Sequence, residues 1–296
     1  MCKPSAPVGI TEEVWVQVVQ VVSISSLKGG VGKTSVTLGL ASAALAAGIP
    51  TLVIDLDPHA DATTGLGVRP TGQIDIGRLL RSSRRADLAA NTVTSGWTSR
   101  ALDQGRSGPG TSRLDVAMGS AYSGIYDRPD LGRRDQRRLA TLLSRLGGYS
   151  LVLIDCPPSL NGLTRMAWTA SERVVLVAEP SLFSVAGTER TMRALELFRR
   201  EFAPDLRTAG IVANRVRPGS VEHTFRLGEM DRMFGGLLLS PTIPELPDWQ
   251  QIQGAAQSVH HWPGEPARQA SSYFDDLLTG VVDSDRMRSR GSRRQV

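Results

Sequence analysis

Residues 28–35 read KGGVGKTS, a glycine-rich segment with one lysine at its start and another near its end. Lys33 and Thr34 fit the end of the G-x-x-x-x-G-K-[ST] phosphate-binding loop, but Leu27 replaces the first glycine of that pattern. Lys28 follows one position later, and two of the three lysines in the chain lie in this loop. An ammonium group is a compact charge that a planar guanidinium does not imitate. The segment therefore predicts a nucleotide-phosphate site.

The loop composition assigns roles to its residues. Glycines let backbone N–H groups converge on phosphate oxygens, helped by the N-terminus of the helix that follows. Lys33 is expected to reach the β- and γ-phosphates, and the Thr34 hydroxyl to ligate Mg²⁺. The residues expected to contact the nucleotide here are Lys28, Gly29, Gly30, Val31, Gly32, Lys33, Thr34 and Ser35.

The segments around the loop predict an α/β fold. Residues 14–25 are rich in β-branched side chains and are expected to end in a buried strand. Residues 36–47 are small and apolar and predict a packed helix that stops at Gly48 and Pro50. Residues 51–57 predict the next buried strand. Strand, loop, helix and strand make a βαβ unit, which implies a parallel sheet.

The same alternation continues along the chain. Further helices are expected over residues 131–146, 187–202 and 273–282, and further strands over 150–154, 173–178 and 210–213. Residues 95–112, which carry Ser, Gly and Pro, are expected to be a long excursion at the domain rim. The predicted architecture is one doubly wound, mostly parallel sheet flanked by helices, over residues 14–282, after a flexible lead (1–13) and before a basic disordered tail (283–296).

Composition limits the classes of protein to consider. A chain of 296 residues with 41% apolar residues can bury a large core, and its net charge of +5, with pI near 9.7, suits a polyanionic partner. Cys2 and Cys156 form no metal or disulfide pattern, so a reducing cytoplasm is the expected compartment. No signal segment or run of 18 apolar residues is present, so neither secretion nor a membrane span is expected.

Acidic residues end two of the expected strands. Asp155 closes the apolar run LVLID and precedes Cys156, and a carboxylate there holds Mg²⁺ directly or through water in phosphoryl-transfer sites. Asp55 and Asp57 alternate within IDLDPH, so on one strand they point the same way. Asp57, nearer the strand end, is expected to orient the attacking water. The predicted Mg²⁺ ligands are thus Thr34, Asp57 and Asp155.

Other nucleotide classes fit less well. The dinucleotide pattern G-x-G-x-x-G is absent, and no N-K-x-D guanine signature is present, so ATP is favoured over GTP. Asn214 follows the expected strand 210–213 and carries an amide able to pair with an adenine edge. From spacing alone, however, an asparagine in that place is more often only a turn former.

Together, the segments KGGVGKTS, IDLDPH (54–59) and LIDCPPSL (153–160) resemble the ParA family of DNA-partition ATPases. This family belongs to the deviant Walker-A class of P-loop NTPases, which includes MinD. The resemblance covers about residues 18–282 and is supported by three weaker matches, AEPSLFSVAG (178–187), ANRV (213–216) and PTIP (241–244). It is closest to the short members of the family that have no N-terminal helix-turn-helix domain.

The resemblance implies a role for each matching residue. Lys28 would be the signature lysine that reaches across a dimer interface to the nucleotide of the partner subunit. Asp57 would position the hydrolytic water and Asp155 would be the Walker-B aspartate. Asn214, with Pro241 and Ile243 of the PTIP segment, would flank adenine.

The family's activity is implied in the same way. ATP would close two subunits into a homodimer whose basic surface binds duplex DNA without sequence preference, on the nucleoid in the cytoplasm. A centromere-binding, ParB-like partner would stimulate slow hydrolysis. The predicted DNA-phosphate contacts are Arg215, Arg217, Arg226 and Arg232.

Three positions depart from the family pattern. His59 stands where glutamine is usual, Ser150 where aspartate commonly precedes the Walker-B strand, and Leu27 where a polar residue precedes the signature lysine. These departures bear on the rate of hydrolysis and on nucleotide-state coupling.

Alternatives within the class stay open. A ParA-like ATPase that positions a cargo other than a DNA centromere is the main one. A MinD-like membrane ATPase would need an amphipathic C-terminal helix, but residues 283–296 offer one Met and one Val, so no stable membrane association is expected. A metallocluster carrier would need paired cysteines that Cys2 and Cys156 do not supply.

Overall fold

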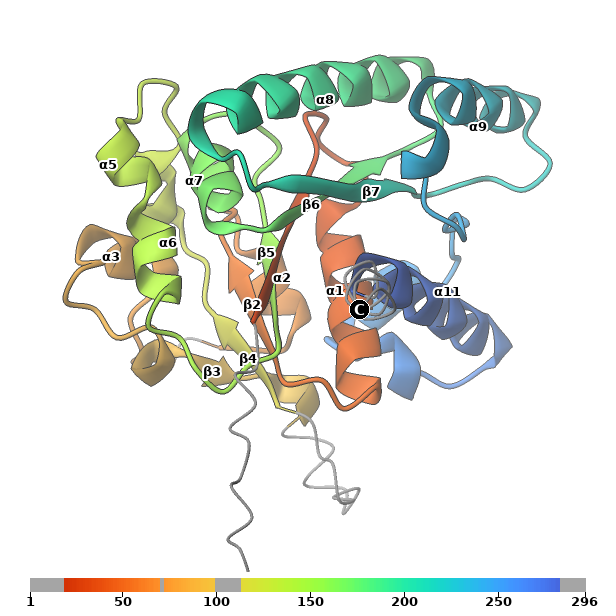
Figure 1. The fold of residues 1–296 in the computed structure, drawn as a ribbon. Coiled ribbons are helices and arrows are strands. Elements are labelled where there is room, and N and C mark those ends of the chain that lie inside the picture. The colour runs from red at the N-terminus through yellow and green to blue at the C-terminus, as the bar shows by residue number, and fades with distance from the viewer. Residues whose placement is uncertain (1–18, 70–71, 99–112, 283–296) are drawn as a thin grey trace, which may run out of the picture.

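The sheet is the framework of the domain (Figure 1). The computed structural model describes residues 19–69, 72–98 and 113–282, and within these ranges seven strands form one sheet in the order β3-β4-β2-β5-β1-β6-β7. β3 pairs antiparallel with β4, and every other pairing is parallel. The strands are β1 (Gln20–Ser25), β2 (Thr51–Asp55), β3 (Val93–Thr94), β4 (Leu114–Ala117), β5 (Leu151–Asp155), β6 (Arg173–Ala178) and β7 (Arg207–Ala213). This confirms the predicted fold class.

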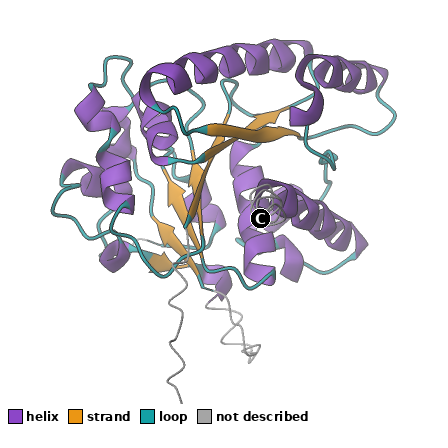
Figure 2. Ribbon diagram, in the orientation of Figure 1, coloured by secondary structure: helices purple, strands orange, loops and turns teal. Residues whose placement is uncertain are grey.

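Helices cover both faces of the sheet (Figure 2). The α-helices of the described ranges are α1 (Lys33–Ala46), α2 (Asp61–Gly65), α3 (Ile76–Arg81), α5 (Arg133–Gln136), α6 (Arg138–Leu143), α7 (Gly162–Ala170), α8 (Leu182–Phe202), α9 (Val221–Phe234), α10 (Trp249–Gly254) and α11 (Glu265–Val282). The short 3₁₀ turns are η1 (Ala89–Asn91), η2 (Ala121–Tyr126), η3 (Gly235–Leu237) and η4 (Val259–His261). No helix in these ranges has the length and apolar character needed to cross a membrane.

The strands are apolar along their length because both faces of the sheet are buried. On β6, Val174, Leu176 and Ala178 pack into a core with α8, whereas Val175 and Val177 pack into the core that contains α1 and α11. Figure 1 shows the same arrangement, with α8 above β6 and β7 and with α1 and α11 below them. The alternation of faces along one strand thus places α8 opposite α1.

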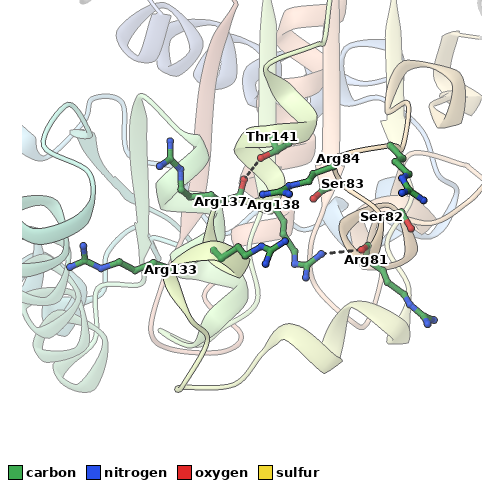
Figure 3. A pocket seen from close by; sticks show the side chains of 10 residues that line it. Arg81, Ser82, Ser83, Arg84, Arg133, Arg137, Arg138 and Thr141 are labelled. Carbon is green, nitrogen blue, oxygen red and sulfur yellow. Dashed lines mark hydrogen bonds between the residues drawn. The ribbon is translucent and has the colours of Figure 1, made fainter.

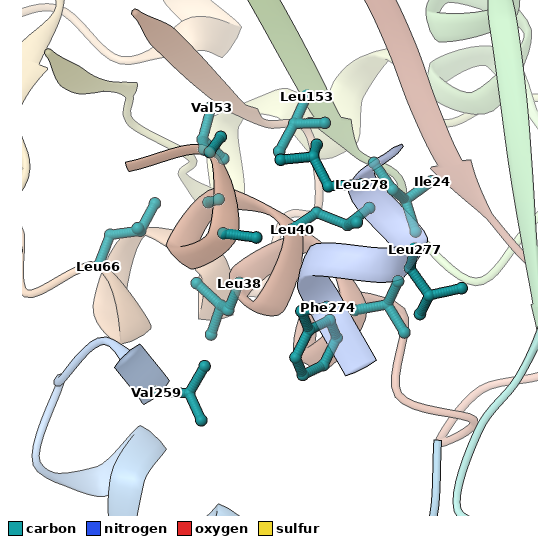
Figure 4. Packing of buried hydrophobic residues seen from close by; sticks show 14 of the residues in the cluster. Ile24, Leu38, Leu40, Val53, Leu66, Leu153, Val259, Phe274, Leu277 and Leu278 are labelled. Carbon is teal, nitrogen blue, oxygen red and sulfur yellow. The ribbon is translucent and has the colours of Figure 1, made fainter. Parts of the chain in front are cut away.

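Helix α1 follows the glycine-rich loop and packs closely against α11 (Figure 4). Leu38 and Leu40 of α1 share one core with Phe274 and Leu277 of α11. At Gly39 an added Cβ would lie 2.1 Å from a ring carbon of Phe274, far inside contact distance. Glycine at this position therefore lets the ring of Phe274 lie directly on the backbone of α1.

Several predicted boundaries differ from the structure. The strand expected over 51–57 ends at Asp55, and the helix expected over 187–202 begins five residues earlier, at Leu182. The single helix expected over 131–146 is two short helices, α5 and α6, which are separated at Arg137, where ψ is 0° instead of the usual helical value near −42°.

Some elements had no counterpart in the prediction. The strands β3 and β4 border the region expected to be an irregular excursion, and residues 99–112 of that region lie outside the described part of the chain. Helix α9 was also not predicted. The lead (1–13), the tail (283–296) and Cys2 lie outside the described residues, so their predicted character stays a prediction.

Candidate nucleotide-binding site

The carboxyl ends of the parallel strands meet at one edge of the sheet, and the candidate residues follow them. The glycine-rich loop follows β1, Asp55 and Asp155 end β2 and β5, and Asn214 follows β7. Open α/β sheets bind their ligands at this edge. The fold therefore brings together residues from segments far apart in the sequence.

The glycine-rich loop presents an uncapped helix end to this edge. Gly32 is the N-cap of α1 with φ 89°, no side chain caps the helix, and no acidic residue occupies its first turn. The backbone N–H groups of that turn are therefore available to an anion, and the helix dipole favours negative charge there. A Cβ at Gly32 would lie 2.3 Å from Nδ2 of Asn214. Glycine is therefore required at this position both by this close approach and by the left-handed backbone conformation.

A cavity of 480 Å³ opens in front of the loop. The predicted site residues that line it are Gly30, Gly32, Lys33, Thr34, Ser35, Asp57 and Arg215. His59 lines it as well, at the position where the family usually has glutamine. Lys28, Gly29, Val31 and Asp155 do not line it, and the side chain of Val31 is buried.

Asp155 lies directly behind the loop. Its Oδ2 accepts a hydrogen bond from Thr34 Oγ1 at 2.7 Å, and its Oδ1 accepts one from Thr37 Oγ1 at 2.8 Å. Burial raises the pKa of Asp155 to about 6, opposed by these two hydrogen bonds and by the charge of Lys33. Burial also lowers the pKa of Lys33, opposed first by Asp155. The loop, the ammonium and the carboxylate therefore form one electrostatically linked unit.

The oxygen atoms of this unit suit a hard divalent cation. Mg²⁺ is commonly held in proteins by one or two carboxylates together with substrate phosphates and water. Thr34 lines the cavity, its hydroxyl contacts the carboxylate of Asp155 behind it, and Asp57 supplies a second carboxylate at the cavity wall. The residues present therefore fit a magnesium ion shared with a bound phosphate chain.

Asp55 is a second buried carboxyl group beside Asp155. The two residues are paired in register on the neighbouring strands β2 and β5. Oδ2 of Asp55 accepts hydrogen bonds from Thr63 N at 2.8 Å and from Thr63 Oγ1 at 2.7 Å, whereas Oδ1 is buried without a partner. Burial and then the charge of Asp155 raise the pKa of Asp55 to about 8. The structure therefore favours the neutral form of this carboxyl group.

Asp57 lies beyond the end of β2 rather than on it. The prediction that Asp55 and Asp57 alternate along one strand is wrong, because the strand ends at Asp55 and the chain turns there. Oδ1 of Asp57 accepts a hydrogen bond from the backbone N–H of His59 at 3.0 Å. This turn places Asp57 at the cavity wall while Asp55 stays in the core.

A smaller cavity of 150 Å³ adjoins the first, since Ser35 and Arg215 line both. Asn214 and Ile243 line the smaller cavity as well, whereas Pro241 does not. Its other walls include aromatic side chains that sequence reasoning missed, Trp249 and Phe274, whose rings stack with centroids 5.4 Å apart. No local sequence signal connects these two rings, because the fold brings α10 and α11 together.

Asn214 also anchors the glycine-rich loop. Its Nδ2 donates a hydrogen bond to the Val31 carbonyl at 2.8 Å, and its backbone N–H donates to the Ala178 carbonyl. Asn214 is buried, so the Val31 carbonyl depends on this donor. The end of β7 is thereby tied to the loop that faces the phosphate cavity.

Lys28 does not line the cavity that Lys33 lines. Its Nζ lies 3.4 Å from Oε2 of Glu179 and 3.3 Å from Oγ of Ser181, and its side chain is 40% exposed. The next residues after Ser181 are apolar and exposed, and Phe183 shows 76% of its surface to solvent. A half-exposed ammonium and an exposed aromatic ring therefore lie at the same rim.

Two of the predicted DNA-contacting arginines lie near the nucleotide site. Arg215, with a left-handed backbone (φ 56°), donates from a terminal guanidinium nitrogen to the Gly30 carbonyl at 2.7 Å. Arg217 donates from Nε to Glu245 at 2.8 Å, and both side chains of this pair are at least half exposed. Arg215 thus belongs to the wall of the phosphate cavity.

The other two predicted arginines lie on α9. Arg226 pairs with Glu222 at 2.7 Å and with Glu229 at 2.9 Å, and its side chain is only 15% exposed. Arg232 is exposed and donates from Nε to the Gly228 carbonyl at 3.1 Å. The charge of Arg226 is therefore neutralised within its own helix.

Cys156 is fully buried beside Asp155. Burial raises the pKa of its thiol to about 12, so the reactive thiolate is disfavoured. Among the described residues, no group of three or more His, Cys, Asp or Glu side chains is arranged to hold a metal ion by itself.

Comparison with known proteins agrees with this geometry. Residues 22–103 match the CobQ/CobB/MinD/ParA nucleotide binding domain, and residues 130–208 match an AAA domain. The chromosome partitioning protein ParA of Caulobacter vibrioides is 33% identical over 200 residues, which cover 65% of this chain and 68% of that protein. The chain belongs to the ParA family. The predicted resemblance is thus confirmed.

Further similarities support a ParA/MinD-type P-loop NTPase. The sporulation initiation inhibitor protein Soj of Bacillus subtilis is 28% identical over 193 residues, covering 65% of this chain and 71% of that protein. The septum site-determining protein MinD of Pyrococcus horikoshii has a TM-score of 0.68 at 21% identity, covering 94% of this chain and 100% of that one. A cobyrinic acid a,c-diamide synthase of Mycobacterium smegmatis has a TM-score of 0.69 at 22% identity, covering 88% and 95%. These two structures show the shared fold.

Proposed function

We propose that this ParA-family chain is an ATPase that uses Mg²⁺. The observation that carries the proposal is one cavity lined by the glycine-rich loop, Lys33, Thr34 and Asp57, with Asp155 bonded to Thr34 behind it. Mg²⁺, held by Thr34, Asp57 and Asp155, would neutralise charge on the phosphates. Lys33 binds the phosphate chain, and Asp57 orients the attacking water. The relatives support this ligand, since the Mycobacterium smegmatis synthase was crystallised with an ATP analogue and magnesium.

The base of ATP would occupy the smaller adjoining cavity. Its aromatic and apolar lining, with Ile243 on one side and the stacked Trp249 and Phe274 on another, suits a purine ring. Asn214 would flank the base while it holds the loop at Val31. Pro241 does not line this cavity, and it stays in the proposal only as a member of the segment that contains Ile243.

The proposal includes a dimer that forms on ATP. Lys28 does not line its own phosphate cavity, and its contacts with Glu179 and Ser181 exceed 3.2 Å, so little holds it in place. The neighbouring Phe183 is an exposed aromatic side chain of the kind that protein interfaces bury. These features support a role for Lys28 at the nucleotide of a second subunit.

In this proposal the dimer binds duplex DNA without sequence preference and acts in plasmid or chromosome partition. The net charge of +5 and the named function of the Caulobacter vibrioides relative support it. Of the predicted contacts, Arg217 and Arg232 are exposed, whereas Arg226 is held by two glutamates and Arg215 faces the nucleotide. A ParB-like partner would stimulate hydrolysis on the nucleoid. A non-DNA cargo is the alternative.

The test is binding of a non-specific DNA duplex at physiological salt with ADP and with ATP. Lys28→Ala is compared with Arg207→Ala. This control removes one exposed charge at the start of β7, whereas Asn214 of the nucleotide site follows the other end of that strand. We expect ATP-dependent binding that Lys28→Ala abolishes and Arg207→Ala retains. Binding that is indifferent to nucleotide would contradict the dimer switch. No binding in any state, with ATP hydrolysis intact, would favour the alternative cargo.

A further inference from the structure

A cavity of 780 Å³ lies apart from the nucleotide site, and arginines dominate its lining (Figure 3). One wall is the end of α3 and the turn after it, which contribute Arg81, Arg84 and Arg85. The other wall is α5 and α6, which contribute four more arginines from residues 133–138. None of the lining residues belongs to the cavities at the nucleotide site. We call this space the arginine cavity.

Two arginines tie the walls of the arginine cavity together. Arg138 on α6 donates to the carbonyls of Leu80 and Arg81 at 2.9 and 3.0 Å, contacts that Figure 3 shows in part. Arg145, after α6, donates to the Arg84 carbonyl at 3.0 Å. Because the two walls are bonded to each other in this way, their other arginines are held at a fixed separation. The cavity is therefore preorganised.

Four arginines of the cavity are left without a partner. Within the described residues their side chains make no ion pair, no hydrogen bond and no ring contact, and all four are exposed. They are Arg84, Arg85, Arg134 and Arg137. No carboxylate lines the cavity, and the nearby Asp135 is engaged by Arg138 at 2.7 Å. Among the described residues, no carboxylate pairs with these four arginines, so their positive charge is available to a ligand.

The chemistry of these side chains defines the ligand. Guanidinium groups bind phosphate oxygens through two parallel hydrogen bonds, and several of them in one space favour an anion with several adjacent charges. The volume lies within the usual range for small-molecule sites, roughly 300–1,000 Å³. A DNA duplex is too wide to enter such a space and would contact only its rim.

We propose that the arginine cavity binds a small anion with two or more adjacent phosphate groups. The shared chemistry is the phosphate chain, which an inorganic polyphosphate or a nucleotide would both supply. The proposal concerns a site separate from the ATPase site, and it does not depend on hydrolysis, dimerisation or DNA binding.

The test is calorimetric titration of the full chain with inorganic tripolyphosphate and, separately, with ADP. All proteins carry Lys33→Ala, so that phosphate binding at the glycine-rich loop is weakened equally. Arg84→Ala/Arg137→Ala is compared with Arg190→Ala/Arg207→Ala, a matched loss of two exposed arginines outside the cavity. We expect the first pair to raise the dissociation constant of tripolyphosphate at least tenfold and the second to change it less than twofold.

The two ligands and a conservative variant complete the experiment. Equal losses for tripolyphosphate and ADP would show that the phosphate chain alone is recognised, whereas tighter binding of ADP would identify a nucleotide as the ligand. Arg84→Lys/Arg137→Lys keeps the charge but not the fork, and should restore binding only in part. Equal tripolyphosphate affinity in all variants would overturn the proposal. A DNA duplex is titrated in parallel, and a loss confined to the duplex would also overturn the proposal, because the cavity rim would then be a DNA contact.

Discussion

Replacing Asp55 by asparagine should change how the stability of the protein depends on pH. Burial and Asp155 raise the pKa of Asp55 from 3.8 to about 8. Between these values the folded chain keeps a proton that the unfolded chain releases, so the free energy of unfolding falls as pH rises. At about 1.4 kcal/mol per unit the bound on this loss is roughly 6 kcal/mol. If only a third of this bound is realised, the loss of unfolding free energy is about 2 kcal/mol, which corresponds to a decrease in Tm of roughly 4–8 °C.

The measurement is Tm by circular dichroism from about pH 4 to about pH 8.5, without nucleotide and with EDTA. The substituted side chain keeps the shape of aspartate and does not titrate. The Tm of Asp55→Asn relative to that of the wild type should therefore rise as pH rises. Asp231→Asn, at an exposed position on α9, serves as the control and should run parallel to the wild type. Parallel curves for Asp55→Asn and the wild type would refute the reasoning, because Asp55 would then be ionised in the folded protein.

Two further substitutions test contacts described above. Asn214→Ala removes the donor to the Val31 carbonyl, which should cost about 1–3 kcal/mol of stability and loosen the phosphate loop. The affinity for ADP, measured by calorimetry, should therefore fall. An unchanged Kd would count against a role of Asn214 in holding the loop. Gly39→Ala forces a Cβ into the Phe274 ring and should lower the free energy of unfolding in urea by about 1–3 kcal/mol. Adding Phe274→Leu should recover part of this stability. If nothing is recovered, the strain does not arise at the Phe274 ring.

Local patterns predicted several residues that the fold brings together at the candidate phosphate site. Lys33, Thr34 and Asp57 line one cavity because the loop, the helix start and the end of β2 are short-range features with strong sequence signals. The strand predicted over 173–178 matches β6 to the residue, since a strand buried on both faces is a continuous apolar run. Helix α8 was predicted too short because its first turn, from Leu182, carries exposed apolar residues.

Contacts between distant segments were not predictable in this way. The bond from Asn214 to Val31 joins residues 183 positions apart, and the arginine cavity joins 81–85 to 133–138. Periodicity reports neighbours along the chain, not which surfaces meet. The pairing of Arg226 does have a local sequence signal, because Arg226 lies four residues after Glu222 and three before Glu229, and these spacings form ion pairs on a helix.

The bonds that join the walls of the arginine cavity also bear on how this surface changes over evolutionary time. Arg138 and Arg145 donate to backbone carbonyls, acceptors that persist whatever side chains replace their neighbours. We therefore expect related chains that keep these two walls to keep a side-chain donor at both positions. If the proposed anion is what maintains Arg84 and Arg137, these two positions should vary more among related chains than Arg138 and Arg145 do.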